Sequence, residues 1–236
     1  MQTEIKQLKF MVTFPDDAKR HEVERCFCTD GCSDQCINVS CNMECTADCT
    51  NCINQNFRMQ KNLPKVTAKD SNFAGKGLFA AERIVSGRFI IPYIGEVISK
   101  DERISRSKKY EKGNAPSYFL ESGKYTIDPT VYGNDAKFAN HSCDPNMVAE
   151  KWICDQHPAG FEAIGFTYIR NIEAGEELTF HYGNRYADSM KCYCGSVKCT
   201  GFVGKSKADV AKMKKIKERG TSSDAVVAKK ARRTVP

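Results

Sequence analysis

The feature that most constrains the fold of this chain is a run of eight cysteines between positions 26 and 52. Few large apolar residues separate them, and the set comprises Cys26, Cys28, Cys32, Cys36, Cys41, Cys45, Cys49 and Cys52. A segment of this composition cannot build a hydrophobic core, so metal or cross-links must hold it together. Thiolates at such short spacings can converge on tetrahedral Zn²⁺, and eight of them could fill two separate four-cysteine sites.

The alternative for this segment is a disulfide knot, which is typical of small secreted domains. The first residues lack the apolar core of a secretory signal, and the longest apolar run, 89–94, is too short to cross a bilayer and contains Pro92. We therefore expect an intracellular protein with reduced thiols, bound metal and no membrane segment. A nucleic-acid-binding zinc module is a second alternative, but the segment contains few Lys or Arg residues.

Positive charge is concentrated at the C-terminal end of the chain. The net charge is +7, and residues 205–236 contain eleven Lys or Arg against three Asp or Glu. Such a tail favours a polyanionic partner, and nucleic acid is the commonest one in a cell. A tail that only aids solubility is the alternative. We expect a short helix near 207–218 and disorder beyond Gly220.

From about residue 65 to 186, short β-like runs are separated by Gly, Pro and Asn. The expected strands are 77–80, 88–91, 95–98, 117–120, 125–127, 147–149, 151–153, 164–169 and 177–180. One helix is expected at Asp101–Lys112, because this segment opens with acidic residues and ends with Lys before Gly113. The fold class is therefore mainly β with short helices.

Three motifs lie in and after this β region: Asn-His-Ser-Cys (140–143), Glu-Leu-Thr-Phe-His-Tyr (177–182) and Cys-x-Cys-x4-Cys (192–199). In this order they resemble the catalytic half of a SET-domain lysine methyltransferase and its post-SET zinc loop. The cysteine-rich segment, with Cys-Ile-Asn at 36–38 and Cys-Ile-Asn-Gln at 52–55, resembles the AWS (pre-SET-like) module. The resemblance covers roughly residues 25–204 and is to the NSD/ASH-type group.

This resemblance implies a SET fold of short strands with a knot-like active site, flanked by zinc-stabilised AWS and post-SET segments. The implied divisions are an N-terminal extension (1–20), an AWS module (21–60), a SET catalytic domain (65–186), a post-SET zinc loop (188–204) and a largely disordered basic tail (205–236).

The resemblance also implies three zinc ions held by eleven cysteines. The first ion would take Cys26, Cys28, Cys32 and Cys36, and the second would share Cys32 and add Cys45, Cys49 and Cys52. The three post-SET cysteines, Cys192, Cys194 and Cys199, are one ligand short of a structural site, and Cys143 would complete it. Cys41 and Cys154 remain as ordinary thiols.

S-adenosylmethionine is the methyl donor that the resemblance implies. Its contacts would come from Gly75, Lys76, Gly77, Ser117, Tyr118, Asn140, His141, Met190 and Phe202. The glycine-containing segment matches the cradle for the methionine part, and Asn140 with His141 would pack against adenine and ribose. An Asn side chain offers both donor and acceptor, which suits a purine edge. Taken alone, the glycines fit a plain turn, and His141 fits a core histidine.

Tyr182 matches the family's catalytic tyrosine, whose hydroxyl would align the substrate amine. Tyr118 would line the same channel, and Tyr186 lies near a position that limits the number of methyl groups in some relatives. The sequence departs from the family pattern at two positions. His181 replaces the usual acidic residue, and Pro92 stands where Glu is common.

The function implied is a histone-lysine N-methyltransferase acting on histone H3 in the nucleosome, with lysine thirty-six as the usual target of this group. Localisation would be the nucleus and chromosome, with DNA contact through the basic tail. The alternatives are a methyltransferase for a non-histone protein lysine and a catalytically inactive SET chromatin adaptor. Intact Tyr182, Asn140 and His141 argue against the inactive adaptor, whereas His181 keeps it open.

Overall fold

The structure, a computed structural model, describes residues 6–7, 19–29, 31–33, 35–73, 75–85, 89–183 and 190–204. The chain divides into two compact units, of which the first combines Met1–Asn140 with Pro145–Phe180 and the second combines His141–Asp144 with His181–Pro236. The expected helix near 207–218, the rest of the basic tail (205–236), Tyr186 and most of the N-terminal extension (1–20) lie outside the described residues.

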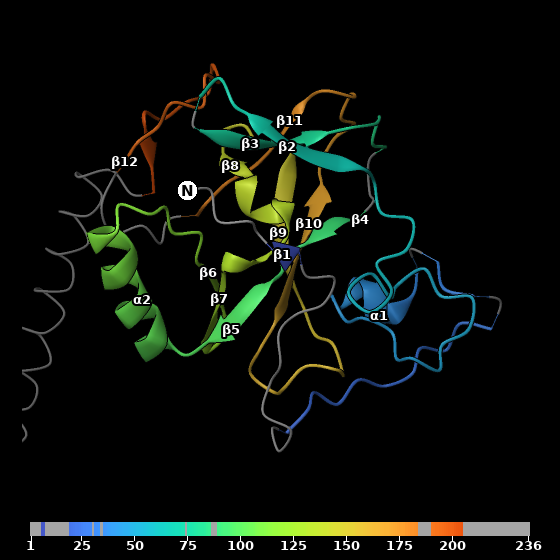
Figure 1. The fold of residues 1–236 in the computed structure, drawn as a ribbon. Coiled ribbons are helices and arrows are strands. Elements are labelled where there is room, and N and C mark those ends of the chain that lie inside the picture. The colour runs from blue at the N-terminus through green and yellow to red at the C-terminus, as the bar shows by residue number, and fades with distance from the viewer. Residues whose placement is uncertain are drawn as a thin grey trace, which may run out of the picture. The chain divides into compact units, whose positions relative to one another are not determined.

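The larger sheet of the first unit follows the order β2-β3-β11-β9-β10-β4 (Figure 1). Its strands are β2 (Val66–Asp70), β3 (Lys76–Ala80), β4 (Phe89–Pro92), β9 (Met147–Trp152), β10 (Ala163–Tyr168) and β11 (Glu177–Phe180). β11 pairs antiparallel with β3 and parallel with β9. The Glu-Leu-Thr-Phe segment therefore lies in the interior of this sheet.

A smaller sheet in the same unit is centred on one long strand. β7 (Tyr125–Gly133) pairs with β1 (Lys6–Gln7), β5 (Gly95–Ile98) and β6 (Leu120–Ser122). The pairing with β1 is parallel and the other two are antiparallel. The 3-10 helix η1 (Asp135–Phe138) follows β7, and β8 (Asn140–His141) spans the boundary between the two units.

The core of the first unit lies where the strands of the larger sheet turn their apolar side chains inward. Leu78, Phe166 and Leu178 have no exposed surface, and the rings of Phe166 and Phe180 are 4.7 Å apart. Each large apolar side chain buried in this way contributes about 1.5–3 kcal/mol to stability. The short β-runs that the sequence predicts thus become one packed layer.

Pro92, one of the two departures from the family pattern, occupies the last position of β4. This strand is the edge of the larger sheet, where a residue without a backbone N–H is tolerated. The Pro92 carbonyl accepts a 2.8 Å hydrogen bond from Asn134 Nδ2. Proline at this position is therefore compatible with the fold.

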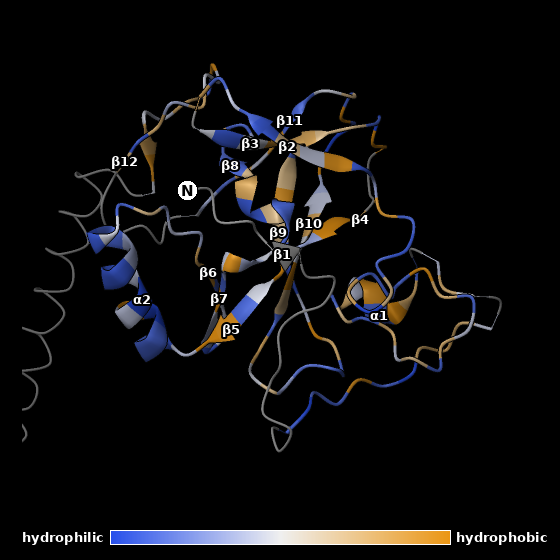
Figure 2. Ribbon diagram, viewed as in Figure 1, coloured by the Kyte–Doolittle hydropathy of each residue, from blue (hydrophilic) through white to orange (hydrophobic). Residues whose placement is uncertain are grey.

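The helix predicted at Asp101–Lys112 is confirmed as α2 (Lys100–Lys112). The Ser99 hydroxyl caps its N-terminus by accepting a 3.1 Å hydrogen bond from the Glu102 N–H. Acidic residues in the first turn and Lys109 and Lys112 in the last turn suit the helix dipole. The helix has no buried residue and is hydrophilic along its length (Figure 2).

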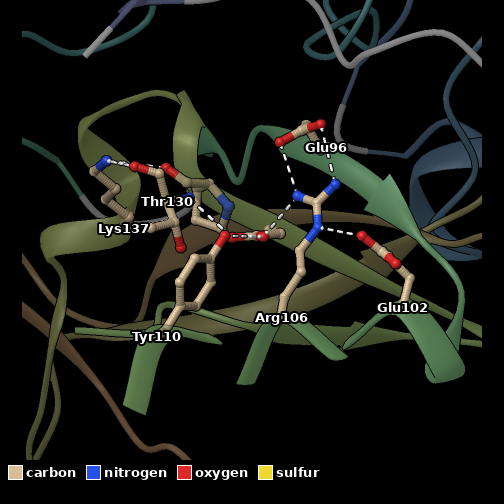
Figure 3. Close-up of polar contacts among 8 residues, drawn as sticks. Glu96, Glu102, Arg106, Tyr110, Thr130 and Lys137 are labelled. Carbon is tan, nitrogen blue, oxygen red and sulfur yellow. Dashed lines mark hydrogen bonds and ion pairs between the residues drawn. The ribbon is translucent and has the colours of Figure 1, made fainter. Parts of the chain in front are cut away.

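Polar side chains attach α2 to the smaller sheet (Figure 3). Arg106 binds Glu96 on β5, Glu102 on its own helix and Asp128 on β7. The Tyr110 hydroxyl donates a 2.8 Å hydrogen bond to the same Asp128 carboxylate. Because the helix lacks an apolar face, these contacts take the role that hydrophobic packing has in most surface helices.

The cysteine-rich segment forms little regular structure beyond the single turn α1 (Ile37–Ser40). It joins the end of β9 through Met43, which pairs with Ile153, and through the Glu44 N–H, which donates to the Ile153 carbonyl at 2.8 Å. In the second unit, β12 (Met190–Lys191) and β13 (Phe202–Val203) form a two-stranded ladder. None of the described helices has the length and apolarity of a membrane span.

One predicted strand is wrong, and seven short elements of the described residues were not predicted. Residues 117–119 form no strand, and β6 begins only at Leu120. The Tyr118 carbonyl instead accepts a hydrogen bond from the Tyr93 hydroxyl, a contact that no local pattern encodes. The two runs expected at 147–149 and 151–153 form the single strand β9, and the elements that were not predicted are β1, β2, β8, β12, β13, α1 and η1.

Candidate functional site

Seven of the eight cysteines between positions 26 and 52 converge in the first unit. The structure contains two groups of four thiols whose sulfur atoms lie within 4.8 Å of one another, namely Cys26, Cys28, Cys32 and Cys36, and Cys26, Cys32, Cys45 and Cys49. The Cys52 sulfur lies 3.4 Å from that of Cys32. Cys41 is exposed and belongs to neither group.

The spacing of these thiols fits zinc. Tetrahedral Zn²⁺ with Zn–S bonds of about 2.3 Å places its sulfur ligands roughly 3.8 Å apart. The sulfur of Cys32 lies 3.4 Å from that of Cys26 and 3.7 Å from that of Cys45. Cys26 and Cys32 belong to both groups, whereas only Cys32 was expected to be shared and Cys52 was expected in place of Cys26. Shared cysteines of this kind suit two neighbouring zinc ions. These cysteine clusters could hold zinc.

A buried carboxylate anchors the cysteine-rich segment, and sequence reasoning missed it. Glu44 is fully buried, and its Oε1 accepts the backbone N–H groups of Phe57 at 2.7 Å and Arg58 at 3.0 Å. Its Oε2 accepts from Gln156 Nε2 at 3.3 Å. Burial raises the pKa of Glu44, and these hydrogen bonds oppose the rise. An acidic residue one position before a cysteine was the only available signal.

The third thiol group lies in the second unit and joins the Asn-His-Ser-Cys motif to the Cys-x-Cys-x4-Cys motif. The sulfur atoms of Cys143, Cys192, Cys194 and Cys199 lie within 4.8 Å of one another, and those of Cys143 and Cys192 are 3.8 Å apart. This is the set that the resemblance to SET-domain proteins implies for the post-SET ion, and its donor atoms suit Zn²⁺. Cys154, in contrast, is buried and belongs to none of the three groups.

The predicted cofactor cradle forms the turn between β2 and β3. Gly75 has φ of +51°, and nothing lies within 4 Å of the position a Cβ would occupy. Its carbonyl accepts a 2.7 Å hydrogen bond from the Ser71 N–H, which closes the turn. The backbone at Gly75 is therefore accessible to a ligand, as a cradle requires.

Asn140 lies against this turn. Its Nδ2 donates to the Lys76 carbonyl at 3.1 Å and to Glu177 Oε1 at 2.8 Å. Both donors of the amide are thus engaged, and the acceptor Oδ1 remains for a ligand. A ligand contact of Asn140 stays a prediction, and Glu177 is a residue whose individual role the sequence did not reveal.

Tyr118 lies in an aromatic and cationic setting in the first unit. Its ring packs edge-on against Phe138 at 5.9 Å, and Lys137 Nζ lies 5.4 Å from its centroid. Burial raises the pKa of Tyr118, so its hydroxyl keeps its proton at neutral pH. Ser117, which precedes it, is exposed.

His141 links the predicted catalytic tyrosine to a thiol ligand in the second unit. The Tyr182 backbone N–H donates to His141 Nδ1 at 3.1 Å, so the imidazole proton sits on Nε2. That nitrogen lies 3.5 Å from the Cys143 sulfur, a distance suited to an N–H donating to a thiolate. Burial, followed by the nearby His181, lowers the pKa of His141 to about 4. His141 is therefore neutral.

The remaining predicted cofactor residues lie on the two-stranded ladder of the second unit. Met190 pairs with Val203, and Phe202 pairs with Lys191. The side chains of Met190 and Phe202 are both exposed, at 50% and 40% of their surface. Their apolar surfaces are free to cover a ligand.

Comparison with known proteins identifies the family to which the central part of the chain is similar. The sequence model of the SET domain matches residues 75–183. The histone-lysine N-methyltransferase ASHR3 of Arabidopsis thaliana is 40% identical over 159 residues, which are 65% of this chain and 30% of ASHR3. An H3 lysine-36 specific histone-lysine N-methyltransferase of Aspergillus oryzae is 38% identical over 159 residues, 65% of this chain and 16% of that protein.

Histone-lysine N-methyltransferase Set2 of Drosophila melanogaster is 36% identical over 157 residues, which are 65% of this chain and 7% of Set2. The chain therefore spans less than a third of the length of these relatives. Among solved structures, a chain of Chaetomium thermophilum Polycomb Repressive Complex 2 bound to GSK126 is similar with a TM-score of 0.58 and 29% identity. The likeness covers 66% of this chain and 24% of that chain.

The SET-domain match begins at the β2–β3 turn and ends just after Tyr182. The matched segment thus contains Gly75, the Asn-His-Ser-Cys motif with Asn140, and the Glu-Leu-Thr-Phe-His-Tyr motif. The relatives named above are histone-lysine N-methyltransferases. Residues 75–183 of this chain therefore belong to the SET-domain family.

Proposed function

We propose that this chain is an S-adenosylmethionine-dependent N-methyltransferase that modifies a lysine of histone H3, with lysine thirty-six as its target. The observation that carries the proposal is 36–40% identity, across the SET region, to proteins named histone-lysine N-methyltransferases. The relative from Aspergillus oryzae is named as specific for H3 lysine-36.

The chemistry requires a neutral, aligned amine. S-adenosylmethionine, when bound, supplies a methyl group activated by a sulfonium. A lysine with a pKa of about 10.4 must lose its proton, which costs about 4.6 kcal/mol at pH 7. Removal of the amine from water in a narrow channel disfavours its charged form and lowers this cost. We assign that role to Tyr118, and we assign alignment of the amine to the Tyr182 hydroxyl.

The assignment of the cofactor residues begins with the turn and the asparagine of the first unit. Backbone groups of Gly75, Lys76 and Gly77 would bind the donor together with the Asn140 side-chain oxygen. The open space at Gly75 and the engaged amide donors of Asn140 support this assignment. We propose that Ser117, Tyr118, His141, Met190 and Phe202 complete the donor site.

We further propose three zinc ions and the corresponding domain organisation. An AWS module (21–60) would hold two ions, a SET domain (65–186) would provide the catalytic residues, and a post-SET loop (188–204) would hold the third ion with Cys143. Three groups of closely spaced thiols support this arrangement. Zinc here would be structural, because all four positions of each site are filled by cysteine.

We propose that the protein acts in the nucleus on chromatin. The partner would be histone H3 within the nucleosome, as the names of the relatives suggest. The eleven basic residues of 205–236 would contact DNA.

The experiment that tests the function is transfer of labelled methyl groups from S-adenosylmethionine to recombinant nucleosomes. One arm uses the wild-type enzyme on nucleosomes in which lysine thirty-six of H3 is replaced by arginine. The other two arms use unaltered nucleosomes with a Tyr182→Phe enzyme and with a Tyr193→Phe control enzyme. Tyr193 is 61% exposed, so its hydroxyl is outside any enclosed channel. We expect label on H3 that is lost with the replaced lysine and with Tyr182→Phe but not with Tyr193→Phe.

Each other outcome selects an alternative. Label that persists on the substituted nucleosome rejects lysine thirty-six as the target. No label despite cofactor binding points to a non-histone protein lysine. No label without cofactor binding indicates an inactive adaptor and directs attention to His181, the departure beside Tyr182.

A further inference from the structure

The carboxylate of Glu177 connects three segments that are distant in sequence. Its Oε1 accepts a 2.8 Å hydrogen bond from Asn140 Nδ2, and its Oε2 accepts a 2.9 Å hydrogen bond from the Ser71 hydroxyl. Ser71 opens the β2–β3 turn, and Glu177 itself begins β11. One side chain thus holds both the turn and the asparagine that the proposed donor site uses.

These bonds fix the orientation of the Asn140 amide. Its two N–H groups point at two acceptors, the Lys76 carbonyl at 3.1 Å and the Glu177 carboxylate. An amide flipped by half a turn would set its oxygen against both acceptors, which is repulsive. The Asn140 oxygen is therefore presented in one direction, as an acceptor for a donor group on a ligand.

The glycine at position 77 allows the carboxylate to approach this closely. Gly77 is buried, and a Cβ there would lie 2.3 Å from Glu177 Oε1 and 2.9 Å from Glu177 Cδ. Its φ does not lie in the left-handed region, so the backbone alone does not demand glycine. A side chain at this position would meet Glu177 first and the Phe79 ring, at 3.0 Å, next.

The contacts of Glu177 differ from those of a glutamate that only stabilises the fold through an ion pair. Glu177 is half-buried, yet in the described part of the chain it forms no ion pair with Lys or Arg. Neighbouring Glu176, in contrast, pairs with Arg170, and Glu173 pairs with Arg83. Glu177 therefore directs its charge at neutral donors of the turn and of Asn140.

We propose that Glu177 is a positioning residue for the methyl donor. It orients the Asn140 oxygen toward an N–H donor of S-adenosylmethionine and holds the 75–77 turn beside it. The inference rests on the proposed function, because it assumes that this turn and Asn140 bind the donor.

The test measures the Kd for S-adenosylmethionine by calorimetry, with KM and kcat from the nucleosome assay and the melting temperature of each variant. For Glu177→Ala we expect Kd and KM for the donor to rise about tenfold or more, the loss typical of a hydrogen bond to a charged group. At saturating donor, kcat should change little, because the reacting groups are untouched. Ser71→Ala removes one anchor and should raise Kd less.

Two further variants separate positioning from general damage. Glu177→Gln keeps a carbonyl oxygen for Asn140 and gains an N–H₂ that can donate to the Ser71 hydroxyl, so it should restore most of the affinity. Glu173→Gln is the matched control, since its side chain is 70% exposed, and it should leave Kd unchanged. Gly77→Ala should weaken donor binding less in the Glu177→Ala background, because the clash partner is gone.

The possible failures are distinguishable. If Glu177→Ala and Ser71→Ala bind the donor like the wild type, the positioning role is overturned while the proposed function stands. A lowered melting temperature with an unchanged Kd also overturns the positioning role, and it shows that Glu177 stabilises the fold. A wild-type chain that does not bind S-adenosylmethionine overturns both proposals.

Discussion

The Arg106 guanidinium donates a 2.9 Å hydrogen bond to Asp128, a carboxylate with no exposed surface. Burial alone would raise the pKa of Asp128, but hydrogen bonds from Thr130, Arg106 and Tyr110 outweigh it and lower the pKa. The buried residue is therefore charged, and its counter-charge comes from a helix without an apolar face. This ion pair and the Tyr110 hydroxyl on the same carboxylate hold α2 against the smaller sheet.

We expect Arg106→Gln to destabilise the fold by about 3 kcal/mol, because it leaves the Asp128 charge buried without its partner. The measurement is urea unfolding followed by circular dichroism. Arg83→Gln is the matched control, since the Arg83–Glu173 pair is 60% and 70% exposed and should contribute at most about 1 kcal/mol. Equal losses in the two variants would show that Asp128 does not need Arg106.

Local sequence signals account for the parts of the fold that were predicted. Ser99, the acidic first turn and Gly113 define α2 through contacts within the helix itself. Short apolar runs at 95–98 and 177–180 are strands with the predicted bounds. The missed strand boundary near Tyr118 depends on the Tyr93 hydroxyl, a tertiary contact that no window of sequence contains.

Only those parts of the candidate site that lie in short contiguous motifs could be predicted from the sequence. The family resemblance gave two of the three thiol groups with the same four cysteines, whereas the remaining group contains Cys26 in place of the expected Cys52. The Asn-His-Ser-Cys motif contains Asn140. Glu177 stood within a quoted motif, but its role arises because Ser71 and Asn140 meet on one carboxylate. Glu44 was missed for the same reason, since its partners lie on two other segments.

We expect His157, which is 5% exposed, to make the free energy of unfolding fall as the pH is lowered. Burial lowers its pKa from 6.5 to about 4, and the neighbouring charges of His21, Arg20 and Arg58 act in the same direction. The folded state thus binds fewer protons than the unfolded state between these values. Stability is fully present above pH 6.5 and is lost as the pH falls toward 4, by about 3 kcal/mol.

The measurement is the free energy of unfolding from pH 7 to pH 4 for the wild type and for His157→Gln. The difference between the two curves isolates His157, because Asp128 and the other carboxylates titrate in both proteins. We expect the difference to shrink as the pH falls. Parallel curves would mean that His157 has the same pKa folded and unfolded.

Glu44 should show the opposite pH dependence. Its pKa is raised by burial, so the folded state holds the proton to higher pH than the unfolded state does. Its contribution is fully present below the ordinary value of 4.5 and is lost as the pH rises through the raised pKa. In Glu44→Gln, which keeps a carbonyl oxygen for the N–H groups of Phe57 and Arg58, this dependence should vanish.

Glu44→Ala should cost about 3 kcal/mol or more at neutral pH, because it leaves two buried N–H donors unpaired. Glu22→Ala, at an exposed glutamate of the same unit, should stay within about 0.5 kcal/mol of the wild type. Unfolding in urea measures both. If Glu44→Ala is as stable as Glu22→Ala, water must satisfy the two donors.

Metal content gives the most direct test of the three thiol groups. Native mass spectrometry should find three zinc ions in the wild type and in Cys41→Ser, because Cys41 is exposed and outside every group. Cys194→Ser should retain two ions, since it breaks only the group around Cys143. Cys32→Ser should retain one, because Cys32 belongs to both groups of the cysteine-rich segment. A wild-type chain without zinc, or a loss of zinc in Cys41→Ser, would contradict this assignment and return the disulfide knot to consideration.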